Sequence, residues 1–211
     1  MSKREFRTIT AAEIRSNDNG TISGYAAVFN SPADLGSFTE SIQKGAFSRC
    51  LGEQPDIRCL INHDTSQILG RTRSGTLQVR EDERGLYFDC NLPDTQAARD
   101  LSTLIKRGDI SGMSFGFYIA EDGDDWSRSE DGTITRSLTD CEVFEVSVCP
   151  FPAYPATSVS VRSLWPDGIP EAVELRTKEQ PAEIVEPPTE VIADTDERDK
   201  MLMRVEIAKR K

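Results

Sequence analysis

The chain has 211 residues and a formal net charge of −11, with 36 acidic against 25 basic residues. So acidic a chain is a poor candidate for binding nucleic acid or an anionic membrane surface, because both need a basic face. The first twenty residues hold no apolar run resembling a signal-peptide core, and no stretch approaches the roughly 20 apolar residues of a membrane span. We therefore expect a soluble intracellular protein with no nucleic-acid and no membrane partner.

The spacing of apolar and turn residues predicts a mostly β protein. Helical spacing of apolar residues occurs in two segments, a short one at 44–51 and a clearer one at 94–107, which Asp94 can cap and Gly108 follows. The predicted strands are 22–29, 57–62, 76–80, 85–92, 113–120, 133–138, 143–149 and 158–161. Many short strands with few helices are typical of an α+β domain built on a small β-barrel or sandwich.

Composition changes near residue 165. Residues 166–190 contain five of the eleven prolines, and residues 167–197 hold ten acids against two bases. Such a segment buries too little apolar surface to offset its ordering entropy, so we expect a disordered acidic tail. Residues 198–211 are basic again, with six bases against two acids, and can form a short amphipathic helix. The predicted domains are 1–165 and a tail of 166–211.

The five cysteines stand at positions 50, 59, 90, 141 and 149. Their number is odd and none forms a C-x-x-C pair, which favours reduced, mostly buried thiols over a disulfide framework or a cysteine nucleophile. A single histidine with scattered cysteines does not predict a zinc site, and residues 108–116 lack the Lys and Ser/Thr of a phosphate loop. We expect no cofactor and no metal.

Two residues have the chemistry of a general base and a nucleophile. His63, the chain's one histidine, stands where the apolar strand 57–62 meets polar residues, and imidazole titrates near neutral pH. It can equally be a surface histidine in a turn. Ser114 lies between Gly112 and Gly116, which leave room beside its hydroxyl for another backbone. A tightly packed strand explains the same pattern, and Ser111 is a competing nucleophile.

Glu145 interrupts the strongly β-prone strand 143–149. A carboxylate at this position is either exposed to solvent or buried with a partner, and a buried one can orient and stabilise an imidazolium. Asp64, Asp140 and Glu142 are the alternatives for that role. Paired carboxylates of a glycosidase stay open, but no spacing distinguishes them.

Together these segments resemble the prohead (capsid maturation) serine protease family of tailed bacteriophages, which is distantly similar to the herpesvirus assembly proteases. The matching stretches, in the family's order, are Ile22 to Phe29, Lys44 to Phe47, Asn62 to Asp64, Gly108 to Phe117, and Phe144 to Val148 leading into Pro152 to Ala156. Each motif alone is weak, but five in order over about residues 6–162 are fairly specific.

The resemblance implies a site and a role. The family's histidine falls on His63 and its serine on Ser114; herpesvirus enzymes use a second histidine, which this chain lacks, so Glu145 is the best match for the third member. By analogy, the oxyanion donors are sought near Ala153 and Tyr154. The resemblance implies a closed β-barrel core with surrounding helices.

It also implies a serine endopeptidase that cleaves itself and segments of the scaffold and major capsid protein, inside the prohead in the host cytoplasm. Self-cleavage near residues 160–170 would release the tail, which can tether the enzyme to the inner shell. Herpesvirus relatives are activated by dimerisation, so a homodimer stays open. The competing hypotheses are a non-catalytic capsid assembly or scaffold module, and an esterase or amidase acting on a small substrate.

Overall fold

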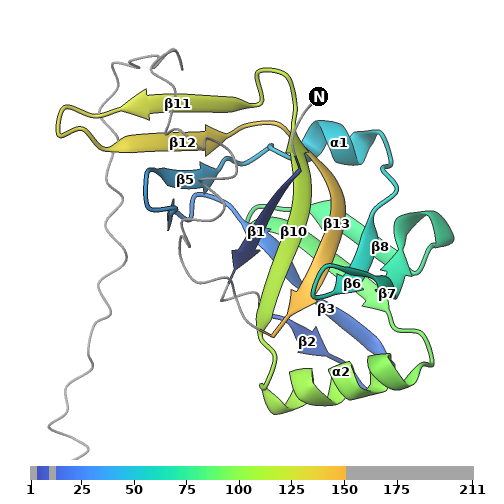
Figure 1. Ribbon diagram of the computed structural model, residues 1–211. Coiled ribbons are helices and arrows are strands. Elements are labelled where there is room, and N and C mark those ends of the chain that lie inside the picture. Colours follow the sequence, from blue (N-terminus) through green and yellow to red (C-terminus); the bar gives the residue numbers. More distant parts are fainter. Residues whose placement is uncertain (1–3, 10–12, 151–211) are drawn as a thin grey trace, which may run out of the picture. The chain divides into compact units, whose positions relative to one another are not determined.

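The computed structural model describes residues 4–9 and 13–150, which contain thirteen strands, two α-helices and a 3₁₀ turn (Figure 1). The predicted strand 158–161, the tail, Ala153 and Tyr154 lie outside this part of the chain. The strands are β1 (Glu5–Ile9), β2 (Arg15–Ser16), β3 (Thr21–Val28), β4 (Ala33–Asp34), β5 (Thr39–Ile42), β6 (Arg58–Ile61), β7 (Asp64–Arg71), β8 (Leu77–Glu81), β9 (Gly85–Asn91), β10 (Gly112–Ile119), β11 (Asp124–Arg128), β12 (Ile134–Leu138) and β13 (Cys141–Cys149). The helical elements are α1 (Ser48–Gly52), η1 (Thr72–Ser74) and α2 (Gln96–Arg107).

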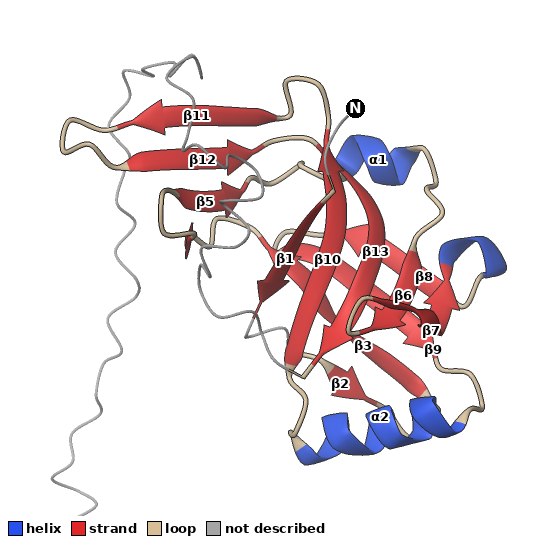
Figure 2. Cartoon of the chain, in the orientation of Figure 1, coloured by secondary structure: helices blue, strands red, loops and turns tan. Residues whose placement is uncertain are grey.

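The strands form three sheets. Their orders are β1-β10-β13-β6-β7, β2-β3-β9-β8 and β11-β12-β5-β4. In the first sheet every neighbouring pair is antiparallel except β13 and β6, which run parallel. The α+β class is confirmed, with strands dominant and the helices at the outside of the strands (Figure 2). The pairings among the described strands do not close a barrel, so the closed barrel stays a prediction.

The hydrophobic core lies between the first two sheets, where β3 packs against β1 and β10. On β10, Met113, Phe115 and Phe117 alternate into this core and are fully buried, because successive side chains of a strand point to opposite faces. Truncating Phe115 or Phe117 to alanine would cost about 3–5 kcal/mol of stability, which includes the cavity left behind. The same alternation places Ser114 and Gly116 on the other face of the sheet.

Helix α2 begins and ends on sequence signals. Its N-cap is Thr95, whose side chain accepts a hydrogen bond from the Ala98 N–H at 3.3 Å. The predicted cap Asp94 is therefore wrong by one residue; its carboxylate pairs with Arg99 instead. Gly108 ends the helix with a left-handed φ of 81°, a conformation that glycine adopts without steric cost. Among the described residues, no helix is long and apolar enough to cross a membrane.

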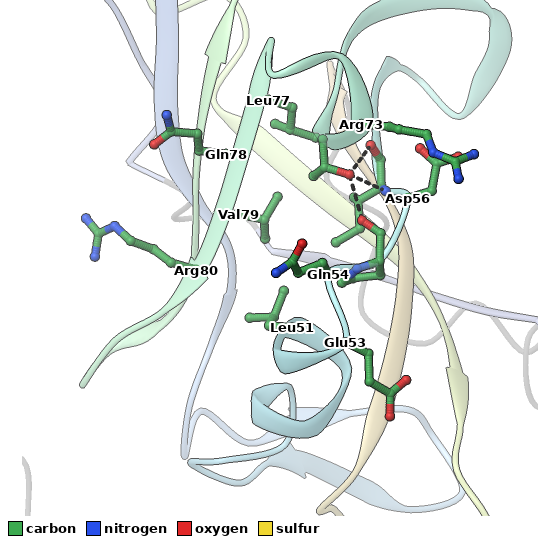
Figure 3. Close-up of a pocket in the computed structure, with 12 residues that line it drawn as sticks. Leu51, Glu53, Gln54, Asp56, Arg73, Leu77, Gln78, Val79 and Arg80 are labelled. Atoms are coloured by element: carbon green, nitrogen blue, oxygen red, sulfur yellow. Dashed lines mark hydrogen bonds between the residues drawn. The ribbon is translucent and has the colours of Figure 1, made fainter.

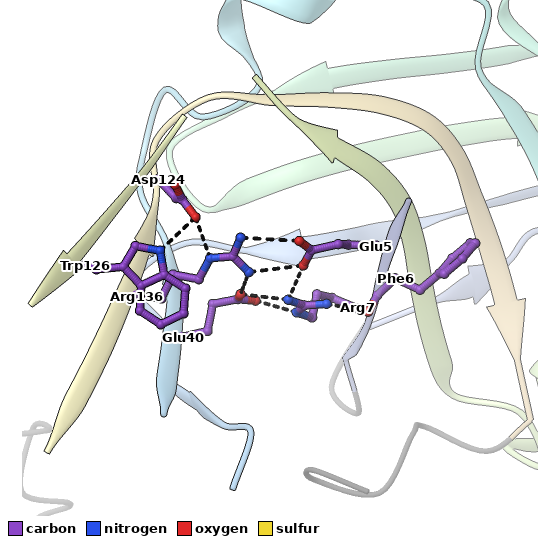
Figure 4. Close-up of polar contacts among 7 residues, drawn as sticks. All are labelled: Glu5, Phe6, Arg7, Glu40, Asp124, Trp126 and Arg136. Atoms are coloured by element: carbon purple, nitrogen blue, oxygen red, sulfur yellow. Dashed lines mark hydrogen bonds and ion pairs between the residues drawn. The ribbon is translucent and has the colours of Figure 1, made fainter. Parts of the chain in front are cut away.

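A buried ion cluster joins β1 to the third sheet (Figure 4). Arg136 on β12 bonds to Glu5 and Glu40, each at 3.1 Å, and to Asp124 at 2.8 Å. Arg7 on β1 pairs with the same two glutamates. The side chains of Glu5, Glu40 and Arg136 are no more than 5% exposed. Because removing one partner would leave buried charge with fewer partners, we expect the loss of any member of this cluster to be destabilising.

Candidate active site

His63 lies in a two-residue turn that connects β6 to β7. Ile61 pairs with Asp64 across the turn, and the two central residues, Asn62 and His63, have φ values of 49° and 60°. Positive φ at both central positions defines the type I′ turn, which matches the twist of the strands it joins. The sequence predicted that β6 ends here. It did not predict the hairpin, because histidine occupies the second central position of the turn, where glycine is usual.

The turn presents the imidazole of His63 to Glu145 on β13. The Nδ1 atom of His63 is hydrogen-bonded to the Glu145 carboxylate. The Glu145 side chain is 8% exposed and that of His63 is 28% exposed. Of the two predicted states of Glu145, the structure therefore shows the buried carboxylate with a partner. This contact fixes the orientation of the ring.

The surroundings of His63 change its pKa in opposite directions. Burial lowers the pKa, because it disfavours the charged form, but hydrogen bonds and charge interactions with Cys149 and Glu145 raise it. The net effect raises the pKa of His63 to about 9. At neutral pH the imidazole is therefore mostly protonated while it rests against the carboxylate.

Ser114 shares this face of the sheet. It pairs with Ser147 on β13, and the next position on the same face, Gly116, pairs with Glu145. The Cα atoms of antiparallel partners are about 4.5–5.5 Å apart. Ser114 and Glu145 are therefore diagonal neighbours on two adjacent strands. Its side chain is fully buried, and its hydroxyl donates to the Arg7 carbonyl of β1 at 2.9 Å. In the described part of the chain, Ser114 and His63 share no hydrogen bond.

The space over Gly116 is occupied by side chains of the site. A Cβ atom at this position would lie 2.7 Å from the Phe144 ring and 2.8 Å from Glu145 Cγ. Phe144 in turn packs edge-on against Phe6, whose ring lies 4.7 Å from that of His63. Gly116 therefore makes room for these two side chains, while β1 and β13 supply the backbones on either side of β10. The part of the predicted space that lies over Gly116 is thus already filled.

In the described part of the chain, the remaining candidates make no hydrogen bond to His63, although Asp64 is its neighbour in the sequence. The Asp64 carboxylate accepts hydrogen bonds from the backbone and side chain of Ser66. Asp140 and Glu142 both pair with Arg49. Ser111 is exposed and precedes β10. Among the predicted acids with described contacts, Glu145 is the one that meets the imidazole.

Sequence reasoning missed Ser147, Cys149 and Phe6. Ser147 and Cys149 follow Glu145 at intervals of two, a spacing that puts strand residues on one face. That signal was available, whereas Phe6 reaches His63 only because β1 pairs with β10, a long-range contact that local pattern does not reveal.

A separate cavity of about 960 Å³ lies between the end of α1 and the edge strand β8 (Figure 3). Its lining includes Leu51, Gln54, Arg73, Leu77 and Val79. None of its lining residues belongs to the His63 face, so this cavity does not bear on the candidate active site.

Comparison with known proteins places the chain in a family. Residues 8–165 match the model of the caudovirus prohead serine protease. The chain belongs to this family. The matched range spans the positions of His63, Ser114 and Glu145, whose roles stay a prediction.

The comparisons give a similar sequence and a partial structural alignment. The prohead protease of Enterobacteria phage HK97 is 35% identical over 137 residues, which cover 64% of this chain and 56% of that protein. The chain thus matches little more than half the length of this relative. The solved structure of the bacteriophage T4 capsid assembly protease aligns with a TM-score of 0.48 and 11% identity, over 70% of this chain and 96% of the other.

Proposed function

We propose that this chain is a serine endopeptidase of prohead maturation that cleaves itself and segments of the scaffold and major capsid protein. The observation that carries the proposal is the His63–Glu145 pair on the same sheet face as Ser114. Family membership supports peptidase chemistry. We expect this cleavage to take place inside the prohead, in the host cytoplasm.

In the proposed mechanism, Ser114 is the nucleophile and His63 the general base. The Ser114 hydroxyl must first leave the Arg7 carbonyl and turn toward the imidazole, since its hydrogen is donated to that carbonyl at rest. His63 then takes the proton as the oxygen attacks a peptide carbonyl, and Glu145 holds the ring and stabilises its charged form. Ala153 and Tyr154 remain the proposed oxyanion donors; losing one such donor costs on the order of 100-fold in rate.

One observation favours a second function, a non-catalytic assembly module. Ser114 is fully buried and already hydrogen-bonded within the fold, as a structural serine would be. The two functions differ in what they require of Ser114. A nucleophile must become accessible, whereas a structural hydroxyl keeps its bond to Arg7.

The deciding experiment follows the intact mass of the wild-type chain and of Ser114→Ala over time, with and without capsid-protein substrate. The protease hypothesis predicts that the wild type shortens, with one cut near residues 160–170, while Ser114→Ala stays full length. Ser111→Ala is the matched control and should shorten like the wild type. If wild type and Ser114→Ala both stay intact, the assembly module is favoured; if both shorten equally, a different nucleophile acts.

A further inference from the structure

The turn that carries His63 is conformationally strained. Asn62 and His63 are consecutive non-glycine residues with left-handed φ, and the second position of a type I′ turn is usually glycine. Asparagine tolerates this region better than most residues, but histidine has a full side chain beyond Cβ. Such a backbone persists only when contacts around it define it, so the groups that hold this turn matter for where the imidazole lies.

Two hydrogen bonds from the backbone of the turn to β13 hold it. The Asn62 N–H donates to the Val148 carbonyl at 2.9 Å, which continues the parallel pairing of β6 with β13. The His63 N–H donates to the side-chain oxygen of Ser147 at 2.8 Å. The first bond uses backbone groups that any residue at position 148 would supply, whereas the second needs a hydroxyl at position 147.

Ser147 also connects the turn to the strand of the proposed nucleophile. It is fully buried and pairs directly with Ser114 across β10 and β13. It lies two residues from Glu145 on the same face. One side chain therefore fixes the backbone of His63 relative to the strands that carry both of its proposed partners.

We propose that Ser147 is a positioning residue that holds the His63 turn in register with Ser114 and Glu145. The inference rests on the proposed function, in which His63 serves as the base. With alanine at position 147 the His63 N–H loses this acceptor, and the Asn62 bond is the one backbone hydrogen bond described between the strained turn and β13 that remains. The imidazole then loses its fixed place beside Glu145, although the strand pairing of β13 is unchanged.

Because His63 is the only histidine, its ring protons give a unique NMR titration. We would record it in a Ser114→Ala background, which prevents self-cleavage, with Ser147, Ala, Thr and Cys at position 147. We expect the raised pKa of His63 to fall toward the ordinary value of about 6.5 in Ser147→Ala and Ser147→Cys, and to be restored in Ser147→Thr. Cysteine has nearly the shape of serine with a weak acceptor, so it tests the hydrogen bond without a cavity.

With Ser114 present, self-processing should slow about 100-fold in the Ala and Cys variants, the scale of a misplaced catalytic group, and recover in the Thr variant. The control is Thr21→Val, which removes a buried hydroxyl in another sheet. It should change neither the pKa of His63 nor the rate.

Two results would overturn the inference: an unchanged His63 titration in both Ser147→Ala and Ser147→Cys, or wild-type rates in these variants while Ser114→Ala is inactive. If instead Ser114→Ala itself processes normally, the proposed function fails, and the titration still reports on the turn.

Discussion

At the scale of single residues, the His63–Glu145 pair predicts how activity depends on pH. The general base must be neutral, and the pKa of His63 is raised to about 9. The rate of self-processing should therefore rise about tenfold per pH unit from neutrality and level off near pH 9. In Glu145→Gln the rise should move to lower pH, because one of the groups that raise the pKa is gone, and the plateau should fall by up to about 10⁴-fold.

The same pKa fixes the sign of a stability effect. The folded state binds the His63 proton more tightly than the unfolded chain does. Protonation of His63 therefore adds to the free energy of unfolding; this contribution is complete below about pH 6.5 and is lost as the pH rises through about 9. Urea unfolding of Ser114→Ala at pH 6 and pH 10 would measure it. Ser114→Ala/Glu145→Gln should show a smaller difference; an equal difference would place the origin of the pH dependence elsewhere.

Gly116 offers a second test at this scale. A methyl group at this position must displace the Phe144 ring or the Glu145 side chain, which lie under 3 Å from it. We expect Gly116→Ala to slow processing at least tenfold and to destabilise the fold by about 1–3 kcal/mol, the usual cost of overpacking.

The control for this substitution is Gly52→Ala in α1, where an added Cβ meets nothing within 4 Å. It should leave processing unchanged and stabilise the helix by about 0.5–1 kcal/mol. Normal processing by Gly116→Ala would show that the placement of Glu145 does not limit the reaction.

At the scale of elements, β1 depends on the buried ion cluster. Glu40→Leu would remove one of the two carboxylates that Arg7 and Arg136 share, leaving the buried guanidinium groups with fewer partners. Breaking such a buried pair costs about 3–5 kcal/mol, so the urea midpoint should fall clearly.

The matched control is Glu83→Gln, which removes an exposed ion pair with Lys44. Such pairs contribute little, so the midpoint should not move measurably. Equal midpoints for both variants would mean that the cluster does not hold β1 to the third sheet.

The sequence predicted elements best where local signals were strong. The β8–β9 hairpin across its charged turn, the central strands β10 and β13, and α2 with its glycine end are confirmed. The strands β1, β5, β7 and β11 were missed, because polar residues interrupt their alternation and long-range pairing stabilises them. Ion pairs within the fold, such as those of Glu5 and Arg7, make these polar segments compatible with burial.

The candidate site was predictable in part. The pattern of a carboxylate in an apolar strand made Glu145 a candidate partner of His63 and left Asp64, Asp140 and Glu142 open; the family resemblance favoured Glu145, which the structure shows in contact with the imidazole. The type I′ turn, the Ser147 bond and the cover of Ser114 by β1 depend on which strands become neighbours, and local patterns carry no information on that.

At the scale of the whole molecule, the predicted domain boundary at residue 165 can be tested by truncation. The family match also ends there, and the described core residues run from Ile22 to Val148. In a Ser114→Ala background, the chain 1–165 should melt within about 2–4 °C of the full chain, a shift that corresponds to about 1 kcal/mol at this size. Ile105→Ala, which leaves a cavity beneath α2, should lower the free energy of unfolding by about 2–5 kcal/mol. It shows the size of the shift that a damaged core gives in the same measurement.

The acidic linker and basic end then become testable apart from the fold. If the tail tethers the enzyme to the inner shell, the chain 1–165 should cleave capsid-protein substrate in solution but fail to enter proheads, because the charges of residues 166–211 are missing. Co-purification of each chain with assembled proheads measures this. Full packaging of the chain 1–165 would show that the folded domain itself is recognised, and the tail would then have no part in targeting.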